Sequence, residues 1–128
     1  MTPLVPDAAP APRSIGPVTQ TDIVRFAGAG GDFNPLHHDP AAAAAAGFPG
    51  VIAMGQFQAG ALAGLLSDWV GVERVRSFSV RFVSPVVIGD TITLSARVVA
   101  VAGGLATIEL LAAVGERAVV TATATVSS

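Results

Sequence analysis

Hydrophobic and polar residues alternate through the second half of the chain, which is the period of a β-strand with one buried face. In residues 74–83 (RVRSFSVRFV), Phe78, Val80 and Phe82 fall on one face, opposite serine and arginine side chains. We therefore predict a strand over residues 74–83, with this aromatic and aliphatic face turned toward the core.

Three further strands are predicted at residues 91–101, 105–114 and 117–126. They are separated by Gly103-Gly104 and Gly115-Glu116, which favour tight hairpin turns. Because connections this short leave no room for a crossover, the strands must be antiparallel. The pattern predicts a meander that curls around a helix.

That helix is predicted at residues 51–67, which are apolar on nearly every helical face. Gly55, Gly60 and Gly64 each weaken its intrinsic helix propensity by roughly 1 kcal/mol relative to alanine. A helix that tolerates these glycines needs tertiary support. We expect the glycines to allow close approach between the helix backbone and a surrounding sheet.

A membrane span is the alternative for this region, because residues 40–66 form a long stretch without charged side chains. Gly47, Pro49 and Gly50 interrupt the stretch, and this favours a buried core helix. Residues 1–13 contain four prolines and lack the basic segment of a signal peptide, so we predict a flexible or extended lead-in.

Two shorter helices are predicted before the main one, after a short strand within residues 14–18. Thr19 and Asp22 have the spacing of a capping box and would start a helix over residues 20–29. Asp39 is expected to cap a second helix, which has proline at its first position, continues through alanines and stops at a glycine.

The loop between these helices, GDFNPLHHDP (residues 31–40), concentrates the ionisable groups of an otherwise apolar chain. Asp32 and His37 are the predicted catalytic pair, because a carboxylate and an imidazole facing one small space can hold and deprotonate a water. The alternative for Asp32 is an Asx-turn within its own loop. Asn34 can hydrogen-bond either partner, although an asparagine before Pro35 also favours a purely structural turn.

Other polar candidates have structural interpretations. His38 is expected to face solvent or pack elsewhere, and Asp39 to serve as a helix cap. Zinc binding by His37, His38 and Asp39 is not expected, because adjacent histidines converge poorly on one metal. The first N–H groups of the main helix can bind an oxyanion, and Gly55 would leave room for a ligand there. The alternative for Gly55 is close packing.

At 128 residues, the chain fits one domain. It has no cysteine, which excludes disulfides and thiolate metal sites. The net charge of −2 argues against nucleic acid or an anionic membrane as the main partner. Arg74, Arg76 and Arg81 are interpreted as a solvated strand face, with contacts to the phosphates of coenzyme A as the alternative.

Three segments of the chain resemble the MaoC-like group of (R)-specific 2-enoyl-CoA hydratases and acyl-carrier-protein dehydratases. Residues 26–40 (FAGAGGDFNPLHHDP) resemble the hydratase motif, 51–56 (VIAMGQ) the start of the central helix, and 81–92 (RFVSPVVIGDTI) a strand–Pro–Val–Gly–Asp segment. The resemblance implies an α+β hot-dog fold over residues 14–128, in which an antiparallel sheet wraps a long central helix.

The resemblance also implies a reaction: reversible hydration of trans-2-enoyl thioesters, bound to coenzyme A or a carrier protein, to (R)-3-hydroxyacyl thioesters. Asp32 and His37 align with the catalytic dyad, and Gly55 aligns with the glycine whose N–H binds the thioester oxygen. Asn34, Met54 and Gln56 are expected to contact substrate. No cofactor, metal or membrane span is expected, and the protein would be a cytoplasmic dimer.

Alternatives remain for function and assembly. The family commonly has serine at Gly30 and histidine at Met54, and these departures resemble small subunits that work beside a different hot-dog chain. Such a heteromer would act on bulky enoyl-CoA of steroid or polyketide type. A separate alternative is that this chain is a non-catalytic subunit that stabilises a catalytic partner. A hot-dog thioesterase is a further alternative, although the central helix offers Gln56, Gln58 and a distant Asp68 rather than a central carboxylate.

Overall fold

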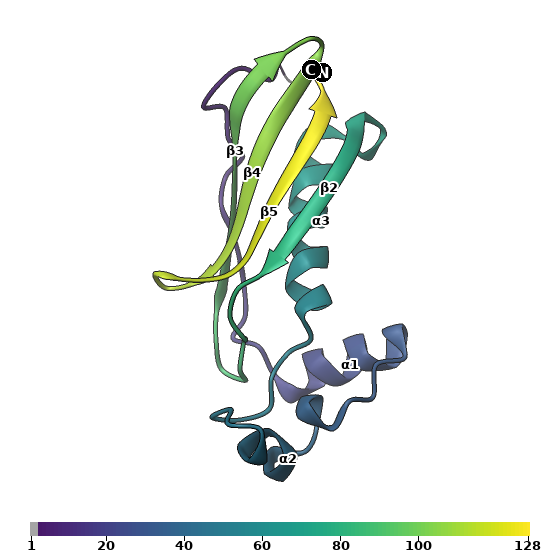
Figure 1. Cartoon of the computed structure of the whole chain (residues 1–128), viewed down its shortest axis with the longest axis vertical. Coiled ribbons are helices and arrows are strands. Elements are labelled where there is room, and N and C mark those ends of the chain that lie inside the picture. Colours follow the sequence, from purple (N-terminus) through teal and green to yellow (C-terminus); the bar gives the residue numbers. More distant parts are fainter. Residues whose placement is uncertain (1–2) are drawn as a thin grey trace.

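The computed structural model describes residues 3–128, in which an antiparallel sheet packs against one long helix. Figure 1 shows α3 running along one face of the sheet, with α1 and α2 gathered at one end of the molecule. The predicted α+β class is confirmed. The helical elements are α1 (Gln20–Gly30), η1 (Pro35–His37), α2 (Pro40–Ala45), α3 (Gly55–Val70) and η2 (Val72–Arg74), and the strands are β1 (Arg13–Ile15), β2 (Val75–Phe82), β3 (Ile92–Ala102), β4 (Leu105–Val114) and β5 (Arg117–Ser127).

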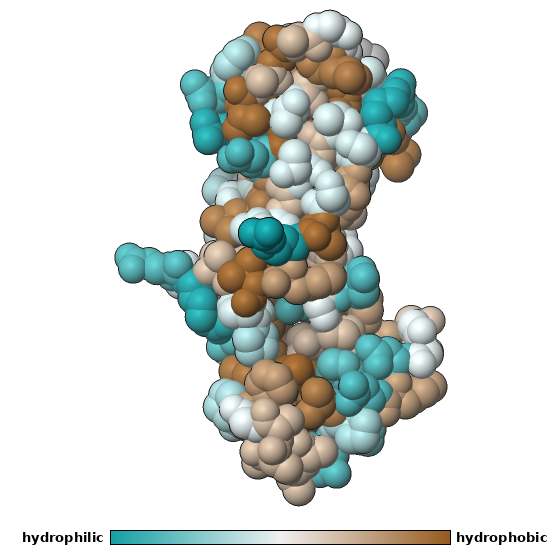
Figure 2. All heavy atoms as spheres, in the orientation of Figure 1, coloured by the Kyte–Doolittle hydropathy of each residue, from teal (hydrophilic) through white to brown (hydrophobic). Residues whose placement is uncertain are grey.

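The strands lie in the order β1-β3-β4-β5-β2, and every neighbouring pair is antiparallel. Strands β3, β4 and β5 form the predicted hairpins. At the first turn, Gly103 and Gly104 have φ of 61° and 78°, a left-handed conformation that glycine adopts without strain. The β4–β5 hairpin projects from the body of the molecule, and its tip is hydrophilic (Figure 2).

The predicted meander is wrong for β2, which pairs with the last strand, β5, rather than with β3. In this order β2 is three strand spacings away from β3, which is about 14 Å because neighbouring strands are about 4.8 Å apart. The connection over residues 83–91 is long enough to cross that distance, and Val86 within it is fully buried. Sequence alternation identifies a strand but does not say which neighbour it will have.

The inward face of β2 also ends sooner than predicted. Phe78 and Val80 are partly buried against the core, whereas Phe82 at the end of the strand is 53% exposed. Phe82 lies beyond the core because β2 runs on to the N-terminal end of α3. Its ring contacts the helix start rather than the packed interior.

The prediction of a solvated arginine face holds for Arg76 and Arg81 and is wrong for Arg74. Arg74 is only 4% exposed, and its Nε donates a hydrogen bond to the carbonyl of Ser127 at 2.9 Å. Arg74 belongs to η2, one residue before β2 begins, so the alternation of the strand does not govern its direction.

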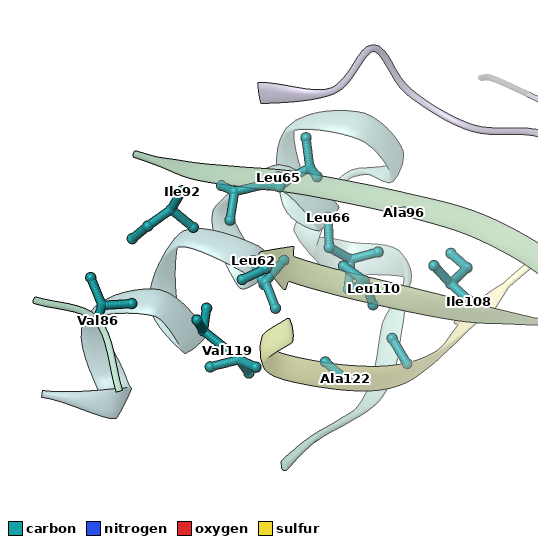
Figure 3. Close-up of a cluster of buried hydrophobic side chains, with 14 of the residues drawn as sticks. Leu62, Leu65, Leu66, Val86, Ile92, Ala96, Ile108, Leu110, Val119 and Ala122 are labelled. Carbon is teal, nitrogen blue, oxygen red and sulfur yellow. The ribbon is translucent and has the colours of Figure 1, made fainter. Parts of the chain in front are cut away.

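The central helix begins at Gly55, four residues later than predicted. The preceding residues run extended, because Ile52 N–H donates to the Leu36 carbonyl (3.0 Å) and Ala53 N–H to the Val86 carbonyl (2.8 Å). Leucines of α3 then meet apolar side chains of the sheet, as Figure 3 shows. Leu62 has no exposed surface, and full burial of such a side chain contributes about 1.5–3 kcal/mol.

The expectation that glycines bring helix and sheet together is wrong for Gly60 and Gly64. A Cβ built at either position meets no atom within 4 Å, so neither glycine is required for a close approach to the sheet. The inward face of α3 is instead occupied by leucines at helical spacing. Among the three glycines within α3, only Gly55 has a close neighbour, which is the Phe82 ring.

Residues 3–12 of the proline-rich lead-in lie beside β3, with a turn at Pro6-Asp7. Asp7 N–H donates to the carbonyl of Val98 (2.8 Å), Val98 N–H donates to Ala8 (2.9 Å), and Leu4 is buried. The flexibility of this segment and its separation from a domain beginning at residue 14 stay predictions. Within residues 3–128, no helix has both the length and the hydropathy that a bilayer span requires.

Candidate active site

Side-chain hydrogen bonds cap the N-terminal ends of the two helices that flank the polar loop. At the start of α1, the predicted capping box is present: Asp22 N–H donates to Thr19 Oγ1 (3.1 Å) and Thr19 N–H to Asp22 Oδ2 (2.9 Å). The backbone N–H of Thr19 is the main reason why the pKa of Asp22 lies below its ordinary value. Beyond the loop, Asp39 Oδ1 accepts from Ala41 N–H at 3.0 Å and starts α2, as predicted.

Within the loop, Asn34 and Asp32 make short-range turns. Asn34 Oδ1 accepts from Leu36 N–H at 3.0 Å and caps η1, which is the structural role considered for it. Asp32 Oδ1 accepts from Asn34 N–H at 3.3 Å, an Asx-turn contact. The turn uses only one oxygen of Asp32, so Oδ2 remains available to face His37.

His37 is held on two sides in a buried position. Its Nδ1 lies 2.8 Å from the Ile52 carbonyl, and its own carbonyl accepts from Gln20 Nε2 at 2.9 Å. A carbonyl oxygen can only accept, so Nδ1 carries the proton. In the neutral ring, Nε2 is then an unprotonated base that points away from Ile52.

That base faces Asp32. His37 Nε2 lies 3.4 Å from Asp32 Oδ2, and the two side chains are 9% and 45% exposed. With a neutral imidazole, both atoms are acceptors, so a donor such as water is the group that can join them. With a charged imidazole, Nε2–H donates to the carboxylate directly. The pair can therefore bind a water, take its proton and keep the resulting charge beside a carboxylate.

Asp32 and His37 open onto a cavity of about 450 Å³ at the N-terminal end of α3. The cavity also includes Met54, Gly55 and Gln56, whereas Asn34 is not among the lining residues. A larger hollow of about 640 Å³ lies over β3, β4 and β5 and includes none of the predicted site residues. The chemistry of the loop thus coincides with the smaller cavity.

Residues of the first turn of α3, Gly55, Gln56 and Gln58, line this cavity. Within the described chain, the N-cap Met54 makes no side-chain hydrogen bond to the helix, so the first amides lack that partner. A Cβ at Gly55 would come within 2.6 Å of two atoms of the Phe82 ring. Gly55 therefore permits close packing against Phe82, and it also lines the cavity. Its binding of an oxyanion stays a prediction.

The remaining polar candidates lie where their structural interpretations put them. His38 is exposed, and its Nε2 is 3.4 Å from the Phe33 carbonyl. Asp68 at the far end of α3 pairs with Arg13 at 2.9 Å and does not line the cavity. Among residues 3–128, no cluster of three histidine or acidic side chains is placed to hold a metal ion.

Sequence reasoning missed three contributors to the site. The Ile52 carbonyl orients His37, and the ring of Phe82 covers Gly55. Gln58 is 2% exposed and lines the cavity from α3. A glutamine within an apolar helix was a visible signal. The other two contacts join residues far apart in the chain and left no sequence signal.

Comparison with known proteins identifies the family. The sequence profile of the MaoC like domain matches residues 4–120, which is nearly the whole chain. The chain belongs to the MaoC-like domain family. The resemblance of the chain to that family is thereby confirmed.

One relative is similar in sequence over part of its length, and another is similar in structure over nearly all of it. The chain is 42% identical over 83 residues to 3-hydroxyacyl-thioester dehydratase X of Mycobacterium tuberculosis, and the match spans 29% of that protein. It superposes on a chain of the ChsH1–ChsH2 complex from M. tuberculosis with a TM-score of 0.86 and 30% identity, covering 96% and 97% of the two chains.

A second solved structure is similar over the same extent. The (R)-hydratase from A. caviae involved in PHA biosynthesis has a TM-score of 0.85 and 30% identity, with 97% of this chain and 96% of that chain covered. These similarities confirm the hot-dog fold, in which the antiparallel sheet packs around α3.

Proposed function

We propose that this protein catalyses the reversible hydration of trans-2-enoyl thioesters to (R)-3-hydroxyacyl thioesters. The observation that supports it best is the His37 arrangement: Nδ1 bonds the Ile52 carbonyl, and Nε2 faces Asp32 at 3.4 Å on the cavity wall. Addition of water to a double bond requires a base that removes a proton from the water and an acid that supplies a proton to the substrate. The names of two relatives, a dehydratase and an (R)-hydratase, support the same reaction class.

In the hydration direction, water held between Asp32 and His37 adds its oxygen to C3 of the enoyl group. One proton of that water passes to the pair, and a proton is delivered to C2, so one water is consumed. Dehydration is the reverse. His37 is suited to both directions because its Nε2 can accept a proton in one direction and return it in the other.

Gly55 is proposed to bind the thioester oxygen through its N–H at the start of α3. Negative charge develops on this oxygen as the bond to C3 forms, and the positive end of the helix dipole stabilises it. Met54 and Gln56 flank Gly55 on the cavity wall and are proposed to contact the thioester. Asn34 acts on the same site indirectly, by shaping the turn that carries Asp32.

Coenzyme A or a carrier protein is the proposed carrier of the acyl group, and a second hot-dog chain the proposed partner. β2 lies at an edge of the sheet, and Val72, Phe82 and Val83 in and beside it are exposed. An unpaired edge with apolar neighbours is suited to continuing the sheet into another chain. A second copy of this chain or a different hot-dog chain could pair with this edge. A relative of known structure is a chain of a complex named for two components, ChsH1 and ChsH2.

The test is hydration of crotonyl-CoA and a bulkier enoyl-CoA, followed as loss of enone absorbance, with Asp32→Asn and His37→Ala as variants. We expect each variant to lose about 100-fold or more in kcat, the usual contribution of a positioned acid or base. His38→Ala is the matched control and should keep the parent rate. If Asp32→Asn and His37→Ala each keep the parent rate, the assignment of these two residues as the catalytic pair is wrong. If the parent hydrates neither substrate, the proposed reaction is wrong.

The heteromeric form is tested in parallel by co-expression with a second hot-dog chain encoded nearby. Activity that requires both chains would support the heteromer. The same two variants then show whether the chemistry resides in this chain. Loss of activity in the pair on Asp32→Asn would exclude a non-catalytic role.

A further inference from the structure

One polar side chain in the cavity wall has no role in the mechanism proposed above. Gln58 lies on α3 and is 2% exposed, and its Oε1 is buried with no hydrogen-bond partner in the described structure. No other side-chain oxygen or nitrogen in residues 3–128 is left in this state. An unpaired buried acceptor is costly to keep, which points to a partner that binds there.

Gln58 also stands apart from its surroundings. The same cavity is lined by apolar residues of the sheet and of the segment before α3, namely Ile52, Ala53, Phe82, Val119 and Val120. These side chains suit a hydrocarbon acyl group. A polar amide among them marks one position where the acyl group is not purely hydrocarbon.

The location of Gln58 relates it to the thioester. It follows Gly55 by three residues, which is about 4.5 Å along the helix axis. Helical side chains lean back toward the N-terminus, so the amide of Gln58 lies over the first turn. If Gly55 binds the thioester oxygen, the amide is a few bonds along the acyl chain from that carbonyl.

We infer that Gln58 determines substrate specificity by hydrogen-bonding a hydroxyl on the acyl chain, a few carbons beyond the thioester. This rests on the proposed function, which places the thioester at Gly55. A hydroxyl both donates and accepts, so it satisfies the amide in either of its two orientations. A substrate with a methyl in place of that hydroxyl leaves the amide unpaired and is rejected.

The test is binding of paired saturated acyl-CoA ligands, which cannot be hydrated. One member of each pair carries a hydroxyl at C4 or C5, and the other carries a methyl at the same carbon. Affinities are measured by titration calorimetry for the parent and for Gln58→Met, which keeps the side-chain length and removes the amide. We expect the parent to favour one hydroxylated ligand about ten- to a hundredfold, and Gln58→Met to lose that preference.

Gln56→Met is the matched control, because Gln56 is the exposed glutamine at the cavity mouth. It should change the affinity for both members of a pair by the same factor. Gln58→Leu repeats the measurement if the methionine variant folds poorly. Equal binding of both members by the parent overturns the inference, as does a preference that survives in Gln58→Met.

A resident water on Gln58 is distinguished by the same data, since the parent would then show no preference for the hydroxyl. Failure of the proposed function has a separate readout. If the parent hydrates no enoyl-CoA, the reaction assignment fails whatever the ligand pairs show. If hydration depends on Asp32 and the pairs bind equally, only the role of Gln58 fails.

Discussion

Gly55→Ala adds one methyl group at the point where the helix start, the Phe82 ring and the cavity meet. The new Cβ would lie 2.6 Å from two ring atoms of Phe82. Ordinary contacts between carbon atoms are about 3.5–4.0 Å, so the ring must move by about 1 Å. Phe82 is 53% exposed and can rotate toward solvent. We therefore expect the free energy of unfolding to change by less than about 1 kcal/mol.

Activity should respond far more than stability. The methyl group stands beside the N–H that is proposed to bind the thioester oxygen, and it displaces the bound carbonyl. Misplacement of a reacting group by about 1 Å can reduce the rate about a hundredfold. We expect Gly55→Ala to lower kcat/KM for enoyl-CoA hydration by about that factor. Enone absorbance measures the rate, and thermal denaturation measures the stability.

Two further variants separate the causes. Gly60→Ala is the control on the same helix: a Cβ there meets no atom within 4 Å, so activity should stay at the parent level. Removing the ring in Gly55→Ala/Phe82→Ala should relieve the overlap but leave activity low. Parent-level activity in Gly55→Ala would refute the placement of the thioester at Gly55. A loss of several kcal/mol in stability would refute the claim that Phe82 is free to move.

Three further predictions concern the scaffold. Leu62→Ala should reduce the free energy of unfolding by about 2–5 kcal/mol in chemical denaturation, because the fully buried leucine leaves a cavity; a loss under 1 kcal/mol would show that the core collapses around it. Asp39→Ala should cost about 0.5–2 kcal/mol by removing the cap of α2, measured in the same way, and an unchanged stability would show that the cap contributes nothing. The pKa of Asp22 is lowered in the folded protein, so its carboxylate stabilises the fold above its ordinary pKa of 3.8, and this contribution is lost as the pH falls through the lowered value. Melting temperatures of the parent and Asp22→Asn should therefore differ near neutral pH and converge in acid, and a difference that persists in acid would contradict this account.

Short-range features of the fold were predictable from the sequence. The capping box of Thr19 and Asp22, the cap at Asp39 and the glycine turn at Gly103-Gly104 each depend on residues within a few positions of one another. Steric limits on the backbone and the hydrogen-bonding needs of helix ends act over the same short range. Alternation likewise located every long strand to within about two residues.

Pairing across the sheet required the tertiary structure. Alternation gives the face of a strand but carries no information about its neighbour, so β2 was placed beside β3 instead of β5. The roles of Gly60 and Gly64 were misjudged for a related reason, since an apolar helix does not reveal which side the sheet will cover. Both outcomes depend on contacts between distant segments.

The candidate site was also predictable from the sequence only in part. The loop sequence brings Asp32 and His37 together, because a turn built on Asn34 and Pro35 returns the chain over five residues. Only the folded chain brings the Ile52 carbonyl to His37 and so selects the nitrogen that acts as the base. The unpaired amide of Gln58 in the cavity wall is likewise a consequence of packing, since burial decides whether a polar group lacks a partner.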